Sequence, residues 1–525
     1  MERDRPSLRN NIMNHSTSLV HDILRRLDSY HAATTRSSHR DSRNSRDARD
    51  TPSYNDHDAP EQELFVTKCE PNSFQLGTGA SIFTDSLLPA ITSARHEVIF
   101  VTCFWAPSKT LTALCDALTK LAAHRRALIQ DALSKGTTSL PPLRVRICLS
   151  SRSLLQKLLH PQSRDGYVYP PSSWSKKLGL PEAALLEAGG IQLHVKSLFF
   201  LPFSVMHPKF VIIDRQRGFV PSCNVSWEPW LEGCVGIEGD AVQALLAFYS
   251  RTWEQTTDFR GRFDCAVDEE LGFDIRQAGL TLVASTAHHR TTFESHRDRT
   301  LPTLVLPSSY HCNPRFRPLP WQTHPDPPGT PLNVALLQLF ERAQRSIYIQ
   351  TPNLTCEAVI AAVLDALAKG VDVSIVTNRN MMLLEQLATA GTTTSWCIRS
   401  LIRRFRRLKE PHRDLEAGRC QGRLRISYFQ PRPCVGSPGR EGRPLMASSQ
   451  GEEPVHSHLK LTLVDAEYAM LGSGNLDRAS WFTSQELGIL FQGREFCAAV
   501  KAGVDEVLEG RLALVFDSDD GERRG

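Results

Sequence analysis

Two stretches of this 525-residue sequence carry the same five reactive side chains at the same spacing. Each has a histidine, a lysine two positions later, an aspartate five positions after that, and then a serine and an asparagine separated by one residue. The first copy is His207, Lys209, Asp214, Ser222 and Asn224, and the second is His458, Lys460, Asp465, Ser473 and Asn475. Because every internal interval is identical, the pattern indicates an internal duplication rather than coincidence.

These side-chain types are the ones that phosphodiester cleavage requires. The reaction needs a nucleophile, donors for the non-bridging oxygens and a proton for the leaving oxygen. One imidazole can attack phosphorus to form a phosphohistidine, while the other protonates the departing alcohol. The two lysines and a predicted phosphate-binding set can donate hydrogen bonds to the phosphoryl oxygens, so no metal or other cofactor is implied. That set is Ser222, Asn224, Ser473 and Asn475.

Both histidines are expected on rigid, mostly apolar strands. Residues two apart in a strand share a face, so each histidine should project together with its lysine. Asp214 and Asp465 each follow their lysine by five residues, an odd number, so their side chains should point to the other face of the strand. This opposite parity predicts a structural role away from the substrate.

The elements around the two motifs recur in the same order. Apolar patterns predict three strands in each half, at 96–104, 143–150 and 190–197 and at 346–353, 371–378 and 423–429. Helical patterns cover 110–133, 331–344 and 356–370. Glu97 precedes His207 by 110 residues and Ser346 precedes His458 by 112, so the halves are in register. Alternating strands and helices predict an α/β fold of two duplicated lobes, each a mixed sheet flanked by helices.

Composition sets the expected domain boundaries. Residues 1–63 are predicted to be a disordered tail because they are mostly polar and charged, although Leu19, Ile23 and Leu27 have the spacing of a short amphipathic helix. The lobes are predicted to span 64–294 and 331–515, with a proline-rich surface connection at 295–330 and a C-terminal tail at 516–525.

Charge and hydropathy limit the expected partners and the expected cellular location of the protein. A net charge of +4 is mild for this length, so nucleic acid is not the expected partner. The start has no apolar signal region, and no apolar run approaches the roughly 18 residues that span a bilayer. The sequence therefore predicts an intracellular protein, soluble or membrane-peripheral. Its arginine-rich and serine-rich start also admits a mitochondrial presequence, against which the acidic residues there argue: Glu2, Asp4, Asp22 and Asp28.

The twin motif resembles the phospholipase D superfamily, whose signature is H-x-K-x4-D-x6-G-S-x-N. The resemblance covers about residues 65–515. The second copy matches fully as "HLKLTLVD" and "GSGN", whereas Pro221 replaces the glycine in the first. The segment "SGNLDRASWFTSQELGI" is also similar to fungal cardiolipin-synthase-like members. The resemblance implies a monomer with two pseudo-equivalent lobes, one active site at their interface and a phospholipid substrate.

The resemblance also implies individual roles. His207 is the expected nucleophile and His458 the expected acid, assisted by Lys209 and Lys460. The catalytic motif of the family includes Asp214 and Asp465, so these are counted with the catalytic residues despite their parity. Acidic residues that follow each serine–asparagine pair are expected to orient the histidines, and here they are Glu232 and Glu486.

The function is predicted to be phosphodiester cleavage or phosphatidyl transfer on glycerophospholipids. A nuclease and a non-catalytic lipid-binding protein are the alternatives. A basic amphipathic pattern at Arg399–Arg413 fits a peripheral contact with anionic membranes, a nucleic-acid backbone or simply a solvated helix face.

Overall fold

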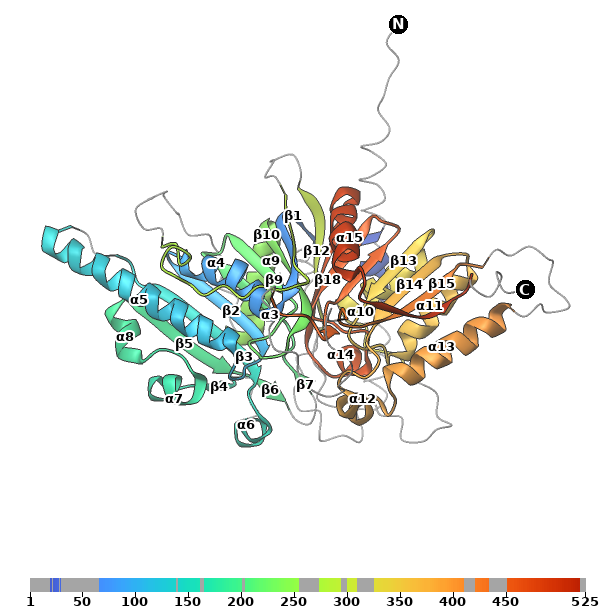
Figure 1. The fold of residues 1–525 in the computed structure, drawn as a ribbon, viewed down its shortest axis with the longest axis horizontal. Coiled ribbons are helices and arrows are strands. Elements are labelled where there is room, and N and C mark those ends of the chain that lie inside the picture. The colour runs from blue at the N-terminus through green and yellow to red at the C-terminus, as the bar shows by residue number, and fades with distance from the viewer. Residues whose placement is uncertain are drawn as a thin grey trace, which may run out of the picture.

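The computed structural model describes most of the chain and shows two halves that lie side by side (Figure 1). The described residues are 19–20, 22–27, 29, 66–137, 140–160, 165–200, 204–254, 273–293, 300–308, 325–409, 421–433 and 451–519.

One mixed sheet of 18 strands runs through the described part of both halves. In the first half the spatial order is β5 (Ile191–Ser197), β3 (Leu143–Ser151), β2 (Glu97–Phe104), β8 (Phe210–Ile213), β9 (Arg217–Pro221), β10 (Trp230–Gly239) and β1 (Val66–Thr78). The second half repeats it as β15 (Leu424–Phe429), β14 (Asp372–Thr377), β13 (Ser346–Gln350), β17 (Leu461–Val464), β18 (Tyr468–Gly472), β19 (Glu486–Gln492) and β12 (Leu301–Ser308). The two series meet where β1 pairs with β12 in antiparallel fashion.

Shorter strands complete the sheet. They are β4 (Tyr167–Val168) beside β5, β20 (Leu512–Asp517) beside β15, β11 (His289–Thr292) beside β1 and β16 (His456–Ser457) beside β10. A separate hairpin joins β6 (Phe199–Phe200) to β7 (Ser204–Val205).

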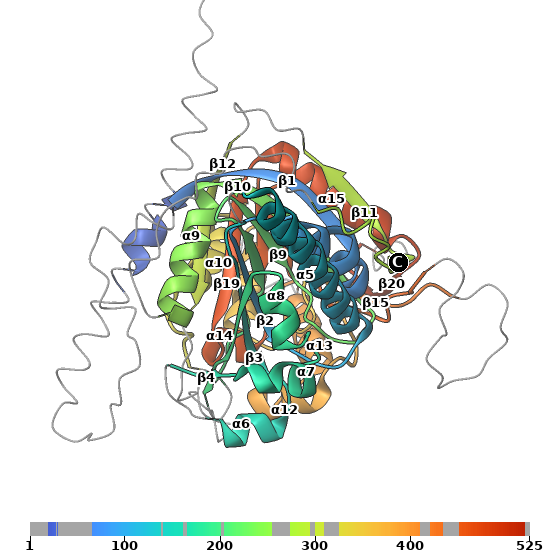
Figure 2. The ribbon, with the colours of Figure 1, turned by 90° about the vertical axis from the view of Figure 1, so that its left-hand side faces the viewer.

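Helices pack against the sheet of each half (Figures 1 and 2). The longer ones are α5 (Lys109–Lys135), α9 (Asp240–Tyr249), α10 (Pro331–Arg342), α11 (Glu357–Ala368), α13 (Thr394–Lys409) and α15 (Arg494–Leu508). The shorter ones are α3 (Gly79–Ile82), α4 (Leu88–Thr92), α6 (Leu154–Leu159), α7 (Trp174–Leu178), α8 (Ala183–Ala188), α12 (Leu383–Ala390) and α14 (Arg478–Phe482). None of the helices within the described ranges has the length and apolarity needed to cross a membrane.

Capping residues explain where the longest helix begins and ends. The Ser108 hydroxyl accepts a hydrogen bond from the Leu111 amide at the start of α5. Gly136 ends the helix in the left-handed conformation, with φ at 65°. The nine elements predicted at 96–104, 110–133, 143–150, 190–197, 331–344, 346–353, 356–370, 371–378 and 423–429 are confirmed within a few residues.

The connection at 295–330 differs from the expectation in one part. Its residues Leu301–Ser308 form β12, which is mostly buried and holds the same place in the second half as β1 does in the first. The second half therefore begins earlier than residue 331. Residues 309–324 lie outside the described part, and at the other end β20 continues past residue 515 to Asp517.

The prediction that residues 1–63 form a disordered tail is wrong for the amphipathic segment. Residues 22–27 are helical, and Leu19, Ile23 and Leu27 are buried in the hydrophobic core of the second half. Arg26 pairs with Glu341 at 2.5 Å on α10. The apolar stripe therefore has a tertiary partner, whereas residues 30–63 lie outside the described residues.

Candidate active site

Both His-x-Lys segments lie at the carboxyl ends of the parallel strands. Phe210, the first residue of β8, pairs with Val101 near the end of β2, and Leu461, the first of β17, pairs with Gln350 at the end of β13. The histidine and lysine of each motif come just before β8 and β17 rather than within them. Such edges are where α/β sheets commonly bind ligands.

The backbone ties each motif to the opposite half. The His207 amide donates to the Gln485 carbonyl at 3.0 Å, immediately before β19. The His458 amide donates to the Leu231 carbonyl of β10 at 2.8 Å. Each histidine is therefore positioned by a strand of the other half.

The side chains make the same crossed pattern. His207 Nδ1 lies 2.9 Å from both carboxylate oxygens of Glu486, and His458 Nδ1 lies 2.8 Å from Glu232 Oε1. Both carboxylates are almost fully buried. The predicted contact of Glu232 and Glu486 with the histidines is thus present, and the structure adds that each carboxylate contacts the histidine of the other half.

The two serines support these carboxylates. Ser222 Oγ donates to Glu232 at 2.5 Å and accepts from the Gly233 amide at 2.9 Å. Ser473 Oγ donates to Glu486 at 2.5 Å and accepts from the Leu487 amide at 3.0 Å. In this arrangement the hydroxyl protons serve the carboxylates, and phosphate binding by the two serines stays a prediction.

Burial disfavours the charged form of both imidazoles. Desolvation lowers the pKa of His458 to about 3, and Lys460 adds to this against the opposing effect of Glu232. Desolvation also lowers the pKa of His207, with Glu486 opposing it. A neutral ring whose Nδ1–H donates to a carboxylate has a free electron pair on Nε2, which is the form that can attack phosphorus or accept a proton.

The two lysines differ in their contacts. Lys209 Nζ donates to the His207 carbonyl at 2.9 Å. Lys460 Nζ makes the equivalent bond to the His458 carbonyl and also lies 2.8 Å from His458 Nε2. Desolvation lowers the pKa of Lys460 to about 7, so this ammonium can release a proton near neutral pH.

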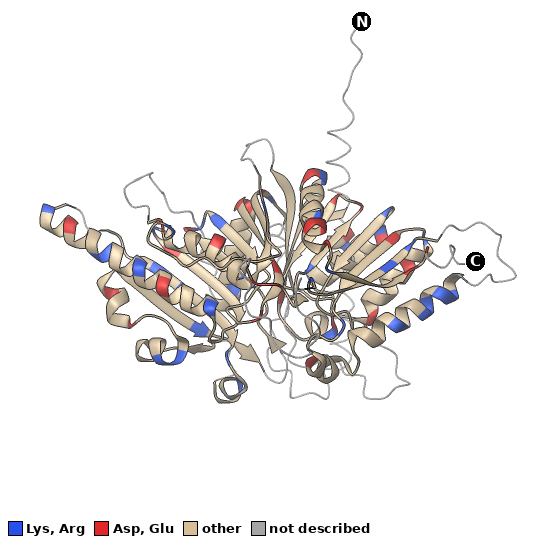
Figure 3. Cartoon of the chain, viewed as in Figure 1, with Lys and Arg blue, Asp and Glu red and all other residues tan. Residues whose placement is uncertain are grey.

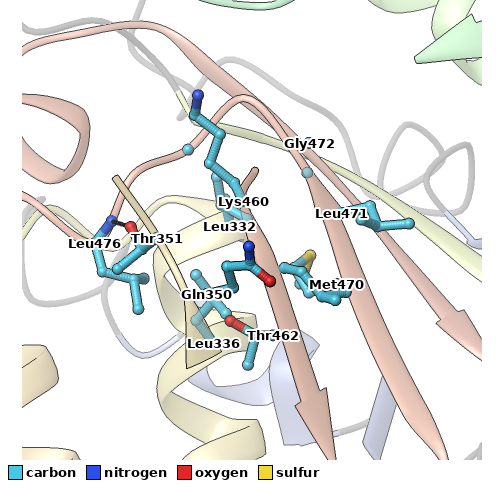
Figure 4. Close-up of a pocket in the computed structure, with 13 residues that line it drawn as sticks. Leu332, Leu336, Gln350, Thr351, Lys460, Thr462, Met470, Leu471, Gly472 and Leu476 are labelled. Atoms are coloured by element: carbon cyan, nitrogen blue, oxygen red, sulfur yellow. Dashed lines mark hydrogen bonds between the residues drawn. The ribbon is translucent and has the colours of Figure 1, made fainter. Parts of the chain in front are cut away.

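A small internal space lies behind the stem of Lys460, lined by side chains that include Gln350 and Met470 (Figure 4). In Figure 4 the Lys460 ammonium points away from these side chains. The space measures about 20 Å³, which is enough for one water molecule and too small for a phosphodiester.

The two asparagines are held in different ways. Asn224 Oδ1 accepts from the Phe104 amide at 3.2 Å, which leaves its Nδ2 as a donor. Asn475 Nδ2 donates to Asp477 at 2.9 Å, while its Oδ1 has no hydrogen-bond partner among the described residues. Phosphate binding by both asparagines stays a prediction.

The two motif aspartates lie at the opposite edge of the sheet and do not join the site. Asp214 accepts hydrogen bonds at 2.8 to 2.9 Å from the amides of Arg95, His96 and Glu97, where β2 begins. Asp465 does the same for residues 344–346 before and at the start of β13. Five residues of extended chain separate Asp214 from Lys209, or about 16 Å. Counting Asp214 and Asp465 as catalytic is therefore corrected to a structural role, as their parity indicated.

We expect Asp214→Asn to destabilise the protein without changing its turnover. Asparagine tolerates the φ of 49° at this position, so the substitution removes charge and one acceptor without adding backbone strain. The loss of charge-assisted bonds should lower the free energy of unfolding by about 2 kcal/mol in a denaturant titration. If Asp214→Asn were well folded but its turnover were lowered a thousandfold, this carboxylate would have a catalytic role.

Two positioning residues, Gln350 and Asn378, were not predicted from the sequence. Asn378 forms two hydrogen bonds, at 2.8 and 2.9 Å, with the backbone of Ser457, the residue before His458. Gln350 donates to the Ser457 hydroxyl at 2.7 Å, and the ring of Trp230 packs 4.9 Å from that of His458. Gln350 and Asn378 sit at the carboxyl ends of β13 and β14, so polar residues at strand ends were the available signal.

Comparisons with known proteins agree with this geometry. The family described as "Cardiolipin synthase, PLD-like domain" matches residues 336–508. Cardiolipin synthase A of Pseudomonas putida is 22% identical over 389 residues, 70% of this chain and 63% of that protein. The same enzyme of Pseudomonas entomophila is 22% identical over 366 residues, covering 66% of this chain. The chain thus spans 63% or less of the length of these relatives.

A solved structure shares the fold. The crystal structure of phosphatidylserine synthase from Haemophilus influenzae superposes with a TM-score of 0.50 at 14% identity, covering 87% of this chain and 91% of that one. This likeness is one of fold, and it covers both halves of the chain.

Proposed function

We propose that this chain, which carries a phospholipase D-like domain of the cardiolipin synthase type, cleaves phospholipid phosphodiesters and transfers the phosphatidyl group through a phosphohistidine. One observation carries the proposal: two buried histidines, each bound through Nδ1 to a buried carboxylate of the other half. Such a pair supplies a nucleophile and a proton carrier in one site.

In the first step, the electron pair of His207 Nε2 attacks phosphorus and the bond to the leaving alcohol breaks. His207 suits this role because its side chain is 15% exposed, whereas that of His458 is 4% exposed and its Nε2 already accepts from Lys460. Glu486 stabilises the positive charge that grows on the ring. Lys209, Lys460 and the amide of Asn224 donate to the non-bridging oxygens.

The leaving oxygen takes its proton from His458, which Lys460 resupplies. Lys460 Nζ lies 2.8 Å from His458 Nε2, so as negative charge grows on the leaving oxygen the ring can pass a proton to that oxygen while it takes one from the ammonium. In the second step, His458 accepts the proton of water or an alcohol that attacks phosphorus. The bond to His207 then breaks and its electron pair returns to Nε2.

The acceptor decides between hydrolysis and transfer, and product analysis distinguishes them. We expect incubation with vesicles that contain phosphatidylglycerol to yield phosphatidic acid when water attacks and cardiolipin when a second phosphatidylglycerol attacks. Added ethanol should divert the intermediate to phosphatidylethanol. Mass spectrometry of the lipids measures all three products, and His207→Ala is the control without turnover.

A parallel incubation with DNA or RNA, together with vesicle binding, separates the alternatives. Cleavage of DNA or RNA without any change in the vesicles would identify a nuclease. Intact lipids and intact nucleic acid, with vesicles bound, would leave a non-catalytic lipid-binding protein.

The predicted basic helix supports a membrane setting. α13 exposes arginines along its length (Figure 3), and Arg399, Arg403 and Arg406 line one groove with Trp396. We propose that this face contacts anionic headgroups, which attract basic helices at membrane surfaces. Arg413, the end of the predicted segment, lies outside the described residues.

A further inference from the structure

Two short helices at equivalent places in the two halves expose leucines. α6 follows β3 and α12 follows β14, and these strands hold the same position in the two strand orders. On α6, Leu158 is 67% and Leu159 is 79% exposed. On α12, Leu384 is 84% exposed, with Leu383 at 38% and Leu387 at 42%. Single exposed leucines are ordinary, but repeated clusters at matched positions call for a partner.

Both helices lie at the edge that carries the site. Each begins after the carboxyl end of a parallel strand, which is the edge where the His-x-Lys segments lie. α6 and α12 are at the lower edge of the molecule in both Figure 1 and Figure 2.

We propose that Leu158 and Leu159 of α6, together with Leu383 and Leu384 of α12, insert into the surface of an anionic phospholipid bilayer and seat the site over its substrate. The inference deepens the proposed function and rests on it. Two apolar contacts on opposite halves would hold the sheet edge at the carboxyl ends of the parallel strands against the lipid. A headgroup could then reach His207 without the lipid leaving the membrane.

Charge favours a bilayer over a second copy of the chain. The start of α13 is linked to the segment before α12 by a 2.7 Å hydrogen bond from the Ser395 hydroxyl to the Arg379 carbonyl. This ties the end of α13 that carries the groove of Trp396, Arg399 and Arg403 to the segment that leads into α12. Anionic headgroups neutralise these arginines, whereas a symmetric copy would bring its own arginines against them. A bilayer also accepts both leucine pairs at once.

Vesicle sedimentation tests the proposal with the full chain and equimolar phosphatidylcholine and phosphatidylglycerol. We expect Leu158→Ser with Leu159→Ser, and Leu383→Ser with Leu384→Ser, each to weaken binding roughly tenfold, and the four changes together to abolish it. Leu133→Ser is the matched control, because Leu133 is 69% exposed near the end of α5, at the opposite edge of the sheet. Its binding should equal that of the original chain.

Binding is measured a second time in the His207→Ala background, so that it does not depend on turnover. Unchanged binding by the fourfold variant would overturn the proposal, as would a failure of the original chain to bind vesicles. Sedimentation velocity that shows a dimer lost in the leucine variants would also overturn it, in favour of a second copy. Leucine-dependent binding by a chain that turns over no lipid would support the docking surface and overturn the proposed function.

Discussion

Replacing His207 with alanine should lower lipid turnover by at least about 10⁴-fold, because the substitution removes the proposed nucleophile. His458→Ala should cause a loss of similar size with lipid substrates, whose alkoxide leaving groups need a proton. Turnover is measured with phospholipid vesicles, and the melting temperature verifies that each variant is folded. Full activity in either single variant would refute the assignment of both histidines.

An activated leaving group separates the two roles. A nitrophenyl phosphodiester releases a stable anion that needs no proton, so the first step no longer depends on the acid. His458→Ala should therefore release nitrophenol in a burst at close to the original rate, whereas His207→Ala should release none. The reverse pattern would make His458 the nucleophile, and equal losses with both substrates would leave neither role assigned to a single histidine.

Glu486→Gln and Glu232→Gln should each lower turnover by roughly 10²- to 10³-fold. An amide cannot stabilise the charged ring, and it competes for the wrong ring tautomer. The crossed contacts predict which step each change affects. Glu486→Gln should resemble His207→Ala, with losses on lipid and nitrophenyl substrates alike, whereas Glu232→Gln should resemble His458→Ala and spare the nitrophenol burst.

A matched control distinguishes chemistry from the general cost of altering a buried carboxylate. Glu97 is 1% exposed, like Glu486, but it pairs with Arg146 and Arg215 rather than with a histidine. Glu97→Gln should therefore destabilise the fold and leave the turnover of the folded protein unchanged. If Glu232→Gln instead abolished the nitrophenol burst, each carboxylate would act on the histidine of its own half, and the crossed arrangement would have no catalytic role.

Much of this protein is determined by local sequence. Alternating apolar residues predicted the strands, and helical periodicity predicted α5, α10 and α11, because burial of one face imposes a period that can be read directly. The identical intervals in the two motifs predicted the duplication and the reacting groups. Parity also indicated the structural role of Asp214, since its position relative to Lys209 depends only on the extended chain between them.

Only the tertiary structure shows which residues pack against each buried surface. Leu19 and Ile23 have helical spacing, but spacing does not show that the second half supplies a core for them. The sequence of β12 contains two prolines, which favour a surface connection between the lobes. Its pairing with β1 and β19 nevertheless makes it a central strand.

The crossing of the site is the clearest case. His207 and Glu486 are 279 residues apart, and His458 and Glu232 are 226 apart. The repeat predicts that each half contains a histidine and a carboxylate, and it is equally compatible with pairing inside each half or between them. Only the meeting of β1 with β12, and of each motif with a strand of the other half, selects the crossed pairs, because backbone hydrogen bonds fix which strand ends lie together.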